Sequence, residues 1–216
     1  MKAWVKARDE YSNIIAFPEL FITGYNPQDL ILKPAFQKAS YDIIKKIAED
    51  CLEGPAIALG GPFCEAGKLY NAYYILSQGK IQAIIKKHHL PNQEVFDEVR
   101  LFSSGTVDGP FQVDQMRIGS PICEDAWHTD IVETLAETGA QTLLVPNGSP
   151  YYRGKTDIRQ NVMVSRVVES GLPLVYLNLV GGQDDQVFDG GSFVLNPGGE
   201  LVLQMPQFKE NIATCV

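Results

Sequence analysis

Histidine and cysteine are scarce in this 216-residue sequence, with three and four copies, and their spacing argues against common metal-binding patterns. No two cysteines form a C-x-x-C pair, and no histidine follows a cysteine at zinc-ligand spacing. His88 and His89 are adjacent, so on a strand their rings would point to opposite faces, which disfavours joint binding of one ion. We therefore expect no metal site. We expect reduced thiols at all four cysteines, which are Cys51, Cys64, Cys123 and Cys215.

Long apolar runs and an excess of basic residues are also missing. No stretch approaches the ~20 apolar residues that a membrane span needs, and the first ten residues are too polar for a signal peptide. Lys and Arg number 18 against 26 Asp and Glu, giving a formal net charge of -8. This acidic balance argues against nucleic acid or an anionic membrane as a partner. The lack of a signal peptide predicts reduced cysteines in a cytoplasmic protein.

The pattern of apolar residues predicts alternating strands and helices interrupted by hairpins. We expect strands at 14–17, 56–63, 116–123, 141–148 and 173–182, helices at 35–51, 130–140 and 155–171, and hairpins at 72–87 and 190–206. The two glycines inside 56–63 suit a turn or a close backbone approach. The alternation favours an α/β layered fold with a mixed sheet. The chain length and the lack of linkers favour a single domain over residues 1–216.

Polar or reactive residues repeatedly follow the predicted strands, namely Glu19, Lys87, Cys123 and Asn147. In open α/β sheets ligands gather at strand ends, so we expect these side chains to converge. A cysteine thiol needs activation, and a nearby carboxylate can accept its proton during attack. A lysine can stabilise the anionic tetrahedral intermediate. Cys123, Glu19 and Lys87 together would therefore suit acyl transfer.

Each of these residues also has a purely structural interpretation. A lone cysteine such as Cys123 is more often a small buried hydrophobe than a nucleophile. Glu19 could cap a helix or face water, and Lys86 with Lys87 could be a solvated strand end. The residues alone leave the catalytic and the structural interpretations both open.

Five motifs, in order, resemble a known family. They are "FPELFITGYNPQDLIL", "KKHHLPNQEVFDEVRLF", "PICEDAW", "NGSPYYRGKTDIR" and "GGQDDQVFDGGSFVLNPGGELV". The sequence resembles the nitrilase superfamily of carbon-nitrogen hydrolases, and within it the glutaminase domain of glutamine-dependent NAD synthetase. The resemblance runs from about Ile14 to the C-terminus, and it strengthens the catalytic interpretation.

The resemblance implies a role for each motif residue. Glu19 matches the general base, Lys87 the catalytic lysine, Cys123 the nucleophile and Glu98 a second glutamate that orients the lysine ammonium. The implied reaction is hydrolysis of the L-glutamine side-chain amide. The positions implied to bind or line the pocket for glutamine are Tyr25, Gln93, Trp127, Ser149 and Lys155.

The resemblance also implies a fold, cofactors and partners. The family has an α-β-β-α layered sandwich with mixed sheets. Compared with the family, we expect this sequence to lack the first strand and to start partway through the first helix. The ATP-dependent synthetase domain is also absent from the sequence, so ATP and magnesium would belong to that absent domain. The glutaminase step itself would need no cofactor. The expected partners are L-glutamine, a synthetase domain or chain that receives ammonia, and further copies in a homo-oligomer.

Three functional hypotheses follow. The leading one is a glutaminase that supplies ammonia for NAD synthesis from nicotinic acid adenine dinucleotide. The second is a stand-alone nitrilase-type amidase acting on another small amide, and the third is a catalytically impaired scaffold. Gln93 stands where the family usually has a tyrosine, which would alter contact with the substrate. Ser149 and Lys155 favour the first hypothesis, because a free amino acid needs partners for its charged end.

Overall fold

The computed structural model describes residues 1–93 and 95–215. The chain forms two compact units, residues 1–107 and residues 108–216. Within the described ranges, every helix is too short or too polar to cross a membrane.

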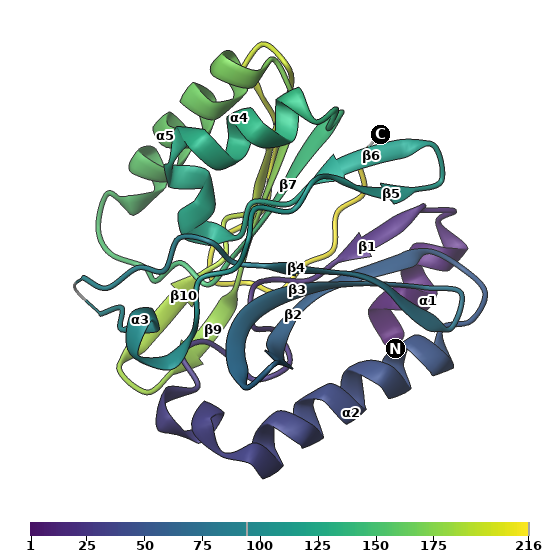
Figure 1. Cartoon of the computed structure of the whole chain (residues 1–216). Coiled ribbons are helices and arrows are strands. Elements are labelled where there is room, and N and C mark those ends of the chain that lie inside the picture. The colour runs from purple at the N-terminus through teal and green to yellow at the C-terminus, as the bar shows by residue number, and fades with distance from the viewer. Residues whose placement is uncertain (94, 216) are drawn as a thin grey trace. The chain divides into compact units, whose positions relative to one another are not determined.

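The first unit is built on a four-stranded sheet in the order β1-β2-β3-β4, with β1 parallel to β2 and the other pairs antiparallel. Helix α2 packs against this sheet (Figure 1). The elements are α1 (Lys2–Asp9), β1 (Ile14–Ala16), η1 (Gln28–Leu32), α2 (Pro34–Asp50), β2 (Ala56–Glu65), β3 (Lys68–Ser77), β4 (Lys80–Lys86) and α3 (Glu98–Leu101).

The predicted helix and hairpin of this unit are confirmed. Proline at the first position of α2 suits a helix start, because its missing N–H would be unpaired there anyway. The helix buries Ser40, Ile44 and Ala48, which recur every four residues on one face. The hairpin between β3 and β4 turns at Gln78 and Gly79, which have φ of 53° and 74°. Two consecutive positive φ angles are what a two-residue type I′ turn requires.

The second unit is built on a six-stranded mixed sheet in the order β12-β11-β8-β7-β6-β5, with a separate two-stranded hairpin of β9 and β10. Strands β6, β7 and β8 are parallel, and the outer pairs are antiparallel. The elements are β5 (Phe111–Val113), β6 (Met116–Gly119), η2 (Cys123–Trp127), α4 (Thr129–Glu137), β7 (Thr142–Asn147), α5 (Lys155–Ser170), β8 (Leu174–Asn178), β9 (Val180–Gln183), β10 (Gln186–Asp189), β11 (Phe193–Leu195) and β12 (Leu201–Gln204).

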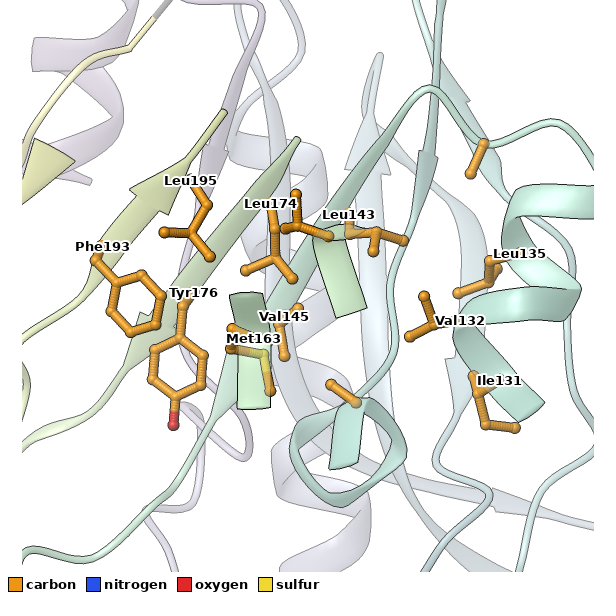
Figure 2. Packing of buried hydrophobic residues seen from close by; sticks show 13 residues of the cluster. Ile131, Val132, Leu135, Leu143, Val145, Met163, Leu174, Tyr176, Phe193 and Leu195 are labelled. Atoms are coloured by element: carbon orange, nitrogen blue, oxygen red, sulfur yellow. The ribbon is translucent and has the colours of Figure 1, made fainter. Parts of the chain in front are cut away.

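The core of the second unit lies between its sheet and the two helices α4 and α5. Figure 2 shows strand residues such as Leu143 and Val145 together with Met163 of α5. At the other end, the rings of Tyr176 and Phe193 stack with centroids 4.7 Å apart. This packing anchors β7, β8 and α5 to one another. Ser149 follows β7 by two residues, and Lys155 is the first residue of α5.

The prediction of one strand over 116–123 is wrong, because the strand is shorter. Strand β6 ends at Gly119, and Cys123 is the first residue of the 3-10 helix η2. Pro121 lies between them and has no N–H to offer a sheet ladder, which explains the early end. Strands β5 and β10 and the short helix α3 were not predicted, because runs of three or four residues carry little periodicity.

A glycine in β2 allows a close backbone approach, as the sequence predicted for this strand. A Cβ built on Gly60 would lie 2.2 Å from the Leu20 nitrogen and 2.6 Å from the Glu19 carbonyl carbon. The Gly60 N–H also donates to the Pro18 carbonyl at 3.1 Å. The turn that carries Glu19 is therefore held directly against the backbone of β2.

Replacing Gly60 with alanine is expected to push this turn away from β2. Gly60→Ala should lower the free energy of unfolding by ~1–3 kcal/mol or more, because the new methyl group meets backbone that cannot rotate away. Urea denaturation measures the loss. The control is Gly182→Ala in β9, where the nearest atom to a new Cβ is 3.5 Å away. Equal stability of the two variants would contradict the close approach.

Candidate active site

A buried cluster of three charged side chains lies in the first unit. The Lys87 ammonium donates to Oε1 of Glu19 at 2.7 Å and to Oε1 of Glu98 at 2.8 Å. All three side chains are 0% exposed. The Lys87 ammonium thus joins carboxylates from two of the five motifs, because Glu19 belongs to the first motif, and Lys87 and Glu98 belong to the second.

The local backbone explains why Lys87 is held so firmly. Lys87 directly follows β4, and its N–H donates to the Asn71 carbonyl in β3 at 2.9 Å. Its own carbonyl accepts from the Gly105 N–H at 2.8 Å. A Cβ on Gly105 would lie 2.4 Å from Cβ of Lys86, so only glycine permits this approach. The main chain of Lys87 is therefore fixed by hydrogen bonds at both its N–H and its carbonyl, independently of the contacts of its side chain.

Two neutral donors complete the cluster. The Tyr25 hydroxyl donates to Oε1 of Glu98 at 2.7 Å, and the Asn71 amide donates to Oε1 of Glu19 at 2.8 Å. Tyr25 was predicted as a pocket residue, whereas Asn71 was not predicted. The available signal was a single asparagine inside the otherwise apolar, buried run of β3. Polar residues buried in a strand need a partner, and here the partner is a carboxylate.

The balance of charge in this cluster perturbs Glu98. Burial raises the pKa of the Glu98 carboxyl to about 6, Lys87 opposes the rise, and the charge of Glu19 adds to it. Two carboxylates share one ammonium, so one of them is easier to protonate than an ordinary glutamate. Such perturbed groups concentrate at functional sites.

Cys123 lies in the second unit, at the start of η2. It is 5% exposed, and its φ of 49° is unusual for a residue with a side chain. The preceding Ile122 N–H donates to Oδ2 of the buried Asp125 at 3.1 Å, which fixes the turn. Strained backbone of this kind persists only where the surroundings hold it, and it clusters at active sites.

Two further predicted residues meet in the second unit. The ammonium of Lys155, the first residue of α5, lies 4.8 Å from the ring centre of Trp127 at the end of η2. It also lies 4.7 Å from the ring of Tyr152. Aromatic faces attract a cation, so these contacts hold the lysine between two rings.

Ser149 is held by a buried polar network that the sequence did not predict. The Arg159 guanidinium donates to Oγ and to the carbonyl of Ser149, at 3.2 Å and 2.7 Å. Arg159 also pairs with Asp189 at 2.8 Å, and both are almost fully buried. Asn178 accepts from the Ser149 N–H at 2.9 Å. The loop after β7 is therefore fixed by side chains from α5, β8 and β10.

Gln93 makes a main-chain contact near the surface. It is exposed in the bend between β4 and α3, and its carbonyl accepts from the Phe96 N–H at 3.0 Å. Its role at a substrate site stays a prediction.

The perturbed carboxyl gives a stability prediction. Its folded pKa of about 6 lies above the ordinary value of 4.5. The stabilising contribution of protonated Glu98 is therefore complete below about pH 4.5 and is lost as the pH rises through about 6. The free energy of unfolding of the wild type should fall by ~2 kcal/mol as the pH rises through this window. The Glu98→Gln variant should not show this fall. Urea denaturation at several pH values measures it, with exposed Glu137→Gln as control. Parallel curves for wild type and Glu98→Gln would refute the assignment.

The Arg159–Asp189 pair gives a second prediction. Arg159→Met leaves the carboxylate of Asp189 buried without its cation, which should cost ~3–5 kcal/mol of unfolding free energy. The double variant Arg159→Met with Asp189→Leu should recover part of this loss. Thermal and urea unfolding measure both, with exposed Arg153→Met as the matched control. A loss below ~1 kcal/mol for Arg159→Met would show that the pair does not hold the loop.

Comparison with known proteins places the whole chain in one family. The sequence model of the carbon-nitrogen hydrolase family matches residues 1–215. The chain is 50% identical over 212 residues to a glutamine-dependent NAD(+) synthetase of Rhodobacter capsulatus, covering 98% of this chain and 38% of that protein. It is 40% identical over 215 residues to the glutamine-dependent NAD(+) synthetase of Aquifex aeolicus, covering 97% and 38%. The chain thus spans about two fifths of the length of these relatives.

Solved structures agree with the sequence comparison. A glutamine-dependent NAD+ synthetase of Acinetobacter baumannii matches with a TM-score of 0.89 and 34% identity, over 97% of this chain and 40% of that one. An amidase of Nesterenkonia from the nitrilase superfamily matches with a TM-score of 0.82 and 25% identity, over 95% and 78%. The mixed α/β fold and the resemblance predicted from the five motifs are confirmed. The chain belongs to the carbon-nitrogen hydrolase family of enzymes.

Proposed function

We propose that this protein hydrolyses the side-chain amide of L-glutamine to glutamate and ammonia. The observation that carries the proposal is the fully buried contact of Lys87 with Glu19 and Glu98. Buried charges cost stability, so a buried cluster of this kind is better explained by chemistry than by folding. Its members also fall at the positions that the family motifs assign to catalysis.

In the first step of the proposed reaction, the sulfur of Cys123 attacks the carbonyl carbon of the amide. Glu19 accepts the thiol proton, a C–S bond forms, and the carbonyl becomes an oxyanion. The Lys87 ammonium and the N–H that follows Cys123 would stabilise that oxyanion. When the intermediate collapses, the C–N bond breaks, and Glu19 returns the proton to the departing ammonia.

In the second step, water hydrolyses the γ-glutamyl thioester. Glu19 takes a proton from the water, whose oxygen adds to the thioester carbon, and the C–S bond breaks. The proton returns to the sulfur, and glutamate leaves with Cys123 restored as a thiol. One carboxylate alternates between base and acid, which an acid-base catalyst must do in a symmetric two-step reaction. We propose that the step requires no cofactor. We also propose that residues 1–216 act as a single catalytic domain.

The substrate contacts are also proposed from the residues. Ser149 and Lys155 would bind the charged end of the free amino acid, while Tyr25, Trp127 and Gln93 would line the pocket. The fixed loop around Ser149 supports this, because specific binding needs groups whose positions are set beforehand. Glu98 would orient the ammonium of Lys87, with which it is in contact.

We further propose that the ammonia serves NAD formation. Relatives named glutamine-dependent NAD(+) synthetase support this, and the chain matches about two fifths of their length. A synthetase part, in the same chain or in another, would use ATP and magnesium to aminate nicotinic acid adenine dinucleotide. We expect a homo-oligomer, and a cytoplasmic location suits a thiol nucleophile because that compartment keeps thiols reduced.

A second candidate is an amidase that acts on another small amide. The match to the Nesterenkonia amidase, which covers 78% of that chain, favours it. A simple aliphatic amide has no charged end and would not need Ser149 and Lys155. Glutamine hydrolysis therefore explains more of the residues present.

The experiment measures glutamate and ammonia released from L-glutamine and from a panel of small amides. Wild type should turn over glutamine, and Cys123→Ala should lose at least ~10³-fold in kcat. Cys51→Ala is the matched control, because Cys51 is also buried with 5% exposure. The double variant Cys123→Ala with Glu19→Gln should be no slower than Cys123→Ala alone, since the two groups act as one unit.

The outcomes separate the candidates. Turnover of another amide with none of glutamine would replace the glutaminase by the amidase. No turnover of any amide, with Cys123 no more reactive toward an alkylating glutamine mimic than Cys51, Cys64 or Cys215, would favour the scaffold hypothesis. Additive effects of the Cys123 and Glu19 substitutions would contradict the proposed proton transfer between them.

A further inference from the structure

Asn71 of β3 touches every member of the buried charged cluster. Its Nδ2 lies 2.8 Å from Oε1 of Glu19 and 3.5 Å from Oε2 of Glu98. Its main-chain carbonyl accepts the Lys87 N–H at 2.9 Å. The side chain is 1% exposed. A single strand residue thus connects the two carboxylates and the backbone of the lysine.

A purely structural role explains Asn71 poorly. Asparagine is a weak strand former, and burying an amide is costly unless both of its ends are paired. The Oδ1 atom of Asn71 is buried with no hydrogen-bond partner among the described residues. An apolar residue of similar size would avoid that cost. Some benefit other than stability must therefore come from the amide donor.

The direction of the amide indicates what this benefit is. The donor end faces the carboxylates, and Asn71 and Lys87 both donate to the same oxygen of Glu19. Hydrogen bonds of this kind stabilise the ionised form of a carboxylate and fix its plane. Lys87 contributes a positive charge. Asn71 contributes a hydrogen-bond donor without adding a further charge to a cluster that already contains three charged side chains.

We propose that Asn71 is a positioning residue that holds the Glu19 carboxylate in place and oriented beside Lys87 for proton transfer. This inference rests on the proposed function, because it assigns Asn71 to the same reaction. It acts through Glu19 and not by touching the substrate.

The test compares Asn71→Leu, which keeps the approximate shape and removes the donor, with wild type. A carboxylate that loses a donor is protonated more readily, so the acidic limb of the pH profile of kcat should move to higher pH. At neutral pH, kcat for glutamine should fall ~10- to 100-fold, as expected for a hydrogen bond to a charged group. KM should change little. Asn71→Ser provides a second, smaller variant should Asn71→Leu fail to fold.

The matched control is Tyr73→Phe. Tyr73 lies on the same face of β3 as Asn71, and its hydroxyl donates to the Phe17 carbonyl at 2.7 Å. Removing it also breaks a buried hydrogen bond on this strand, but one that does not involve a carboxylate. Tyr73→Phe should lower stability without shifting the pH profile. If Asn71→Leu and Asn71→Ser behave like Tyr73→Phe, the role of Asn71 is structural and the proposal is overturned.

A readout without substrate keeps this inference distinct from the proposed function. Carboxyl ¹³C NMR of protein labelled at glutamate follows the titration of the Glu19–Glu98 pair directly, with Glu98→Gln used for assignment. In Asn71→Leu the pair should titrate at higher pH than in wild type. If the titration shifts in Asn71→Leu but wild type does not hydrolyse glutamine, the glutaminase proposal is wrong and the effect of Asn71 on the carboxylates still holds. Normal turnover with an unchanged titration would sink only the role of Asn71.

Discussion

The ammonium of Lys87, buried between the carboxylates of Glu19 and Glu98, is the interaction on which the first unit depends. Three charges removed from water cost far more free energy than a surface ion pair would, so each needs a partner in good geometry. The backbone supplies that geometry. Gly60 lets the Glu19 turn touch β2, and Gly105 lets the chain return against the end of β4. The contacts of the cluster therefore explain where glycines are required.

The same cluster contributes little to the stability of the fold for the charge that it buries, and this points to a chemical role. Apolar side chains of similar size would often stabilise a fold as well or better. Burial, with a smaller contribution from the charge of Glu19, raises the pKa of Glu98 to about 6, close to where a proton-transfer site operates. Membership of the carbon-nitrogen hydrolase family gives this arrangement a chemical context. The proposed amide hydrolysis uses its charge and its donors.

In the second unit, buried polar side chains hold segments of irregular backbone in place. Cys123 has a positive φ, and the loop that carries Ser149 has no regular structure. Both are held by buried polar side chains, Asp125 in one case and Arg159 with Asn178 in the other. Loops carry binding groups well only when a rigid scaffold positions them. The stacked core of this unit supplies that scaffold.

The sequence by itself determined the long periodic elements and the identity of the motif residues. Helices α2, α4 and α5 and the β3–β4 hairpin were predictable, because their apolar spacing and turn residues act locally. The contact of Glu19, Lys87 and Glu98 agreed with the motifs, but the motifs came from resemblance and not from periodicity. Tertiary structure alone decided the partners of Asn71 and Arg159, which segment approaches Gly60, and the start of a 3-10 helix at Cys123. Each of these depends on a segment distant in the sequence or on a backbone angle, and local side-chain pattern encodes neither.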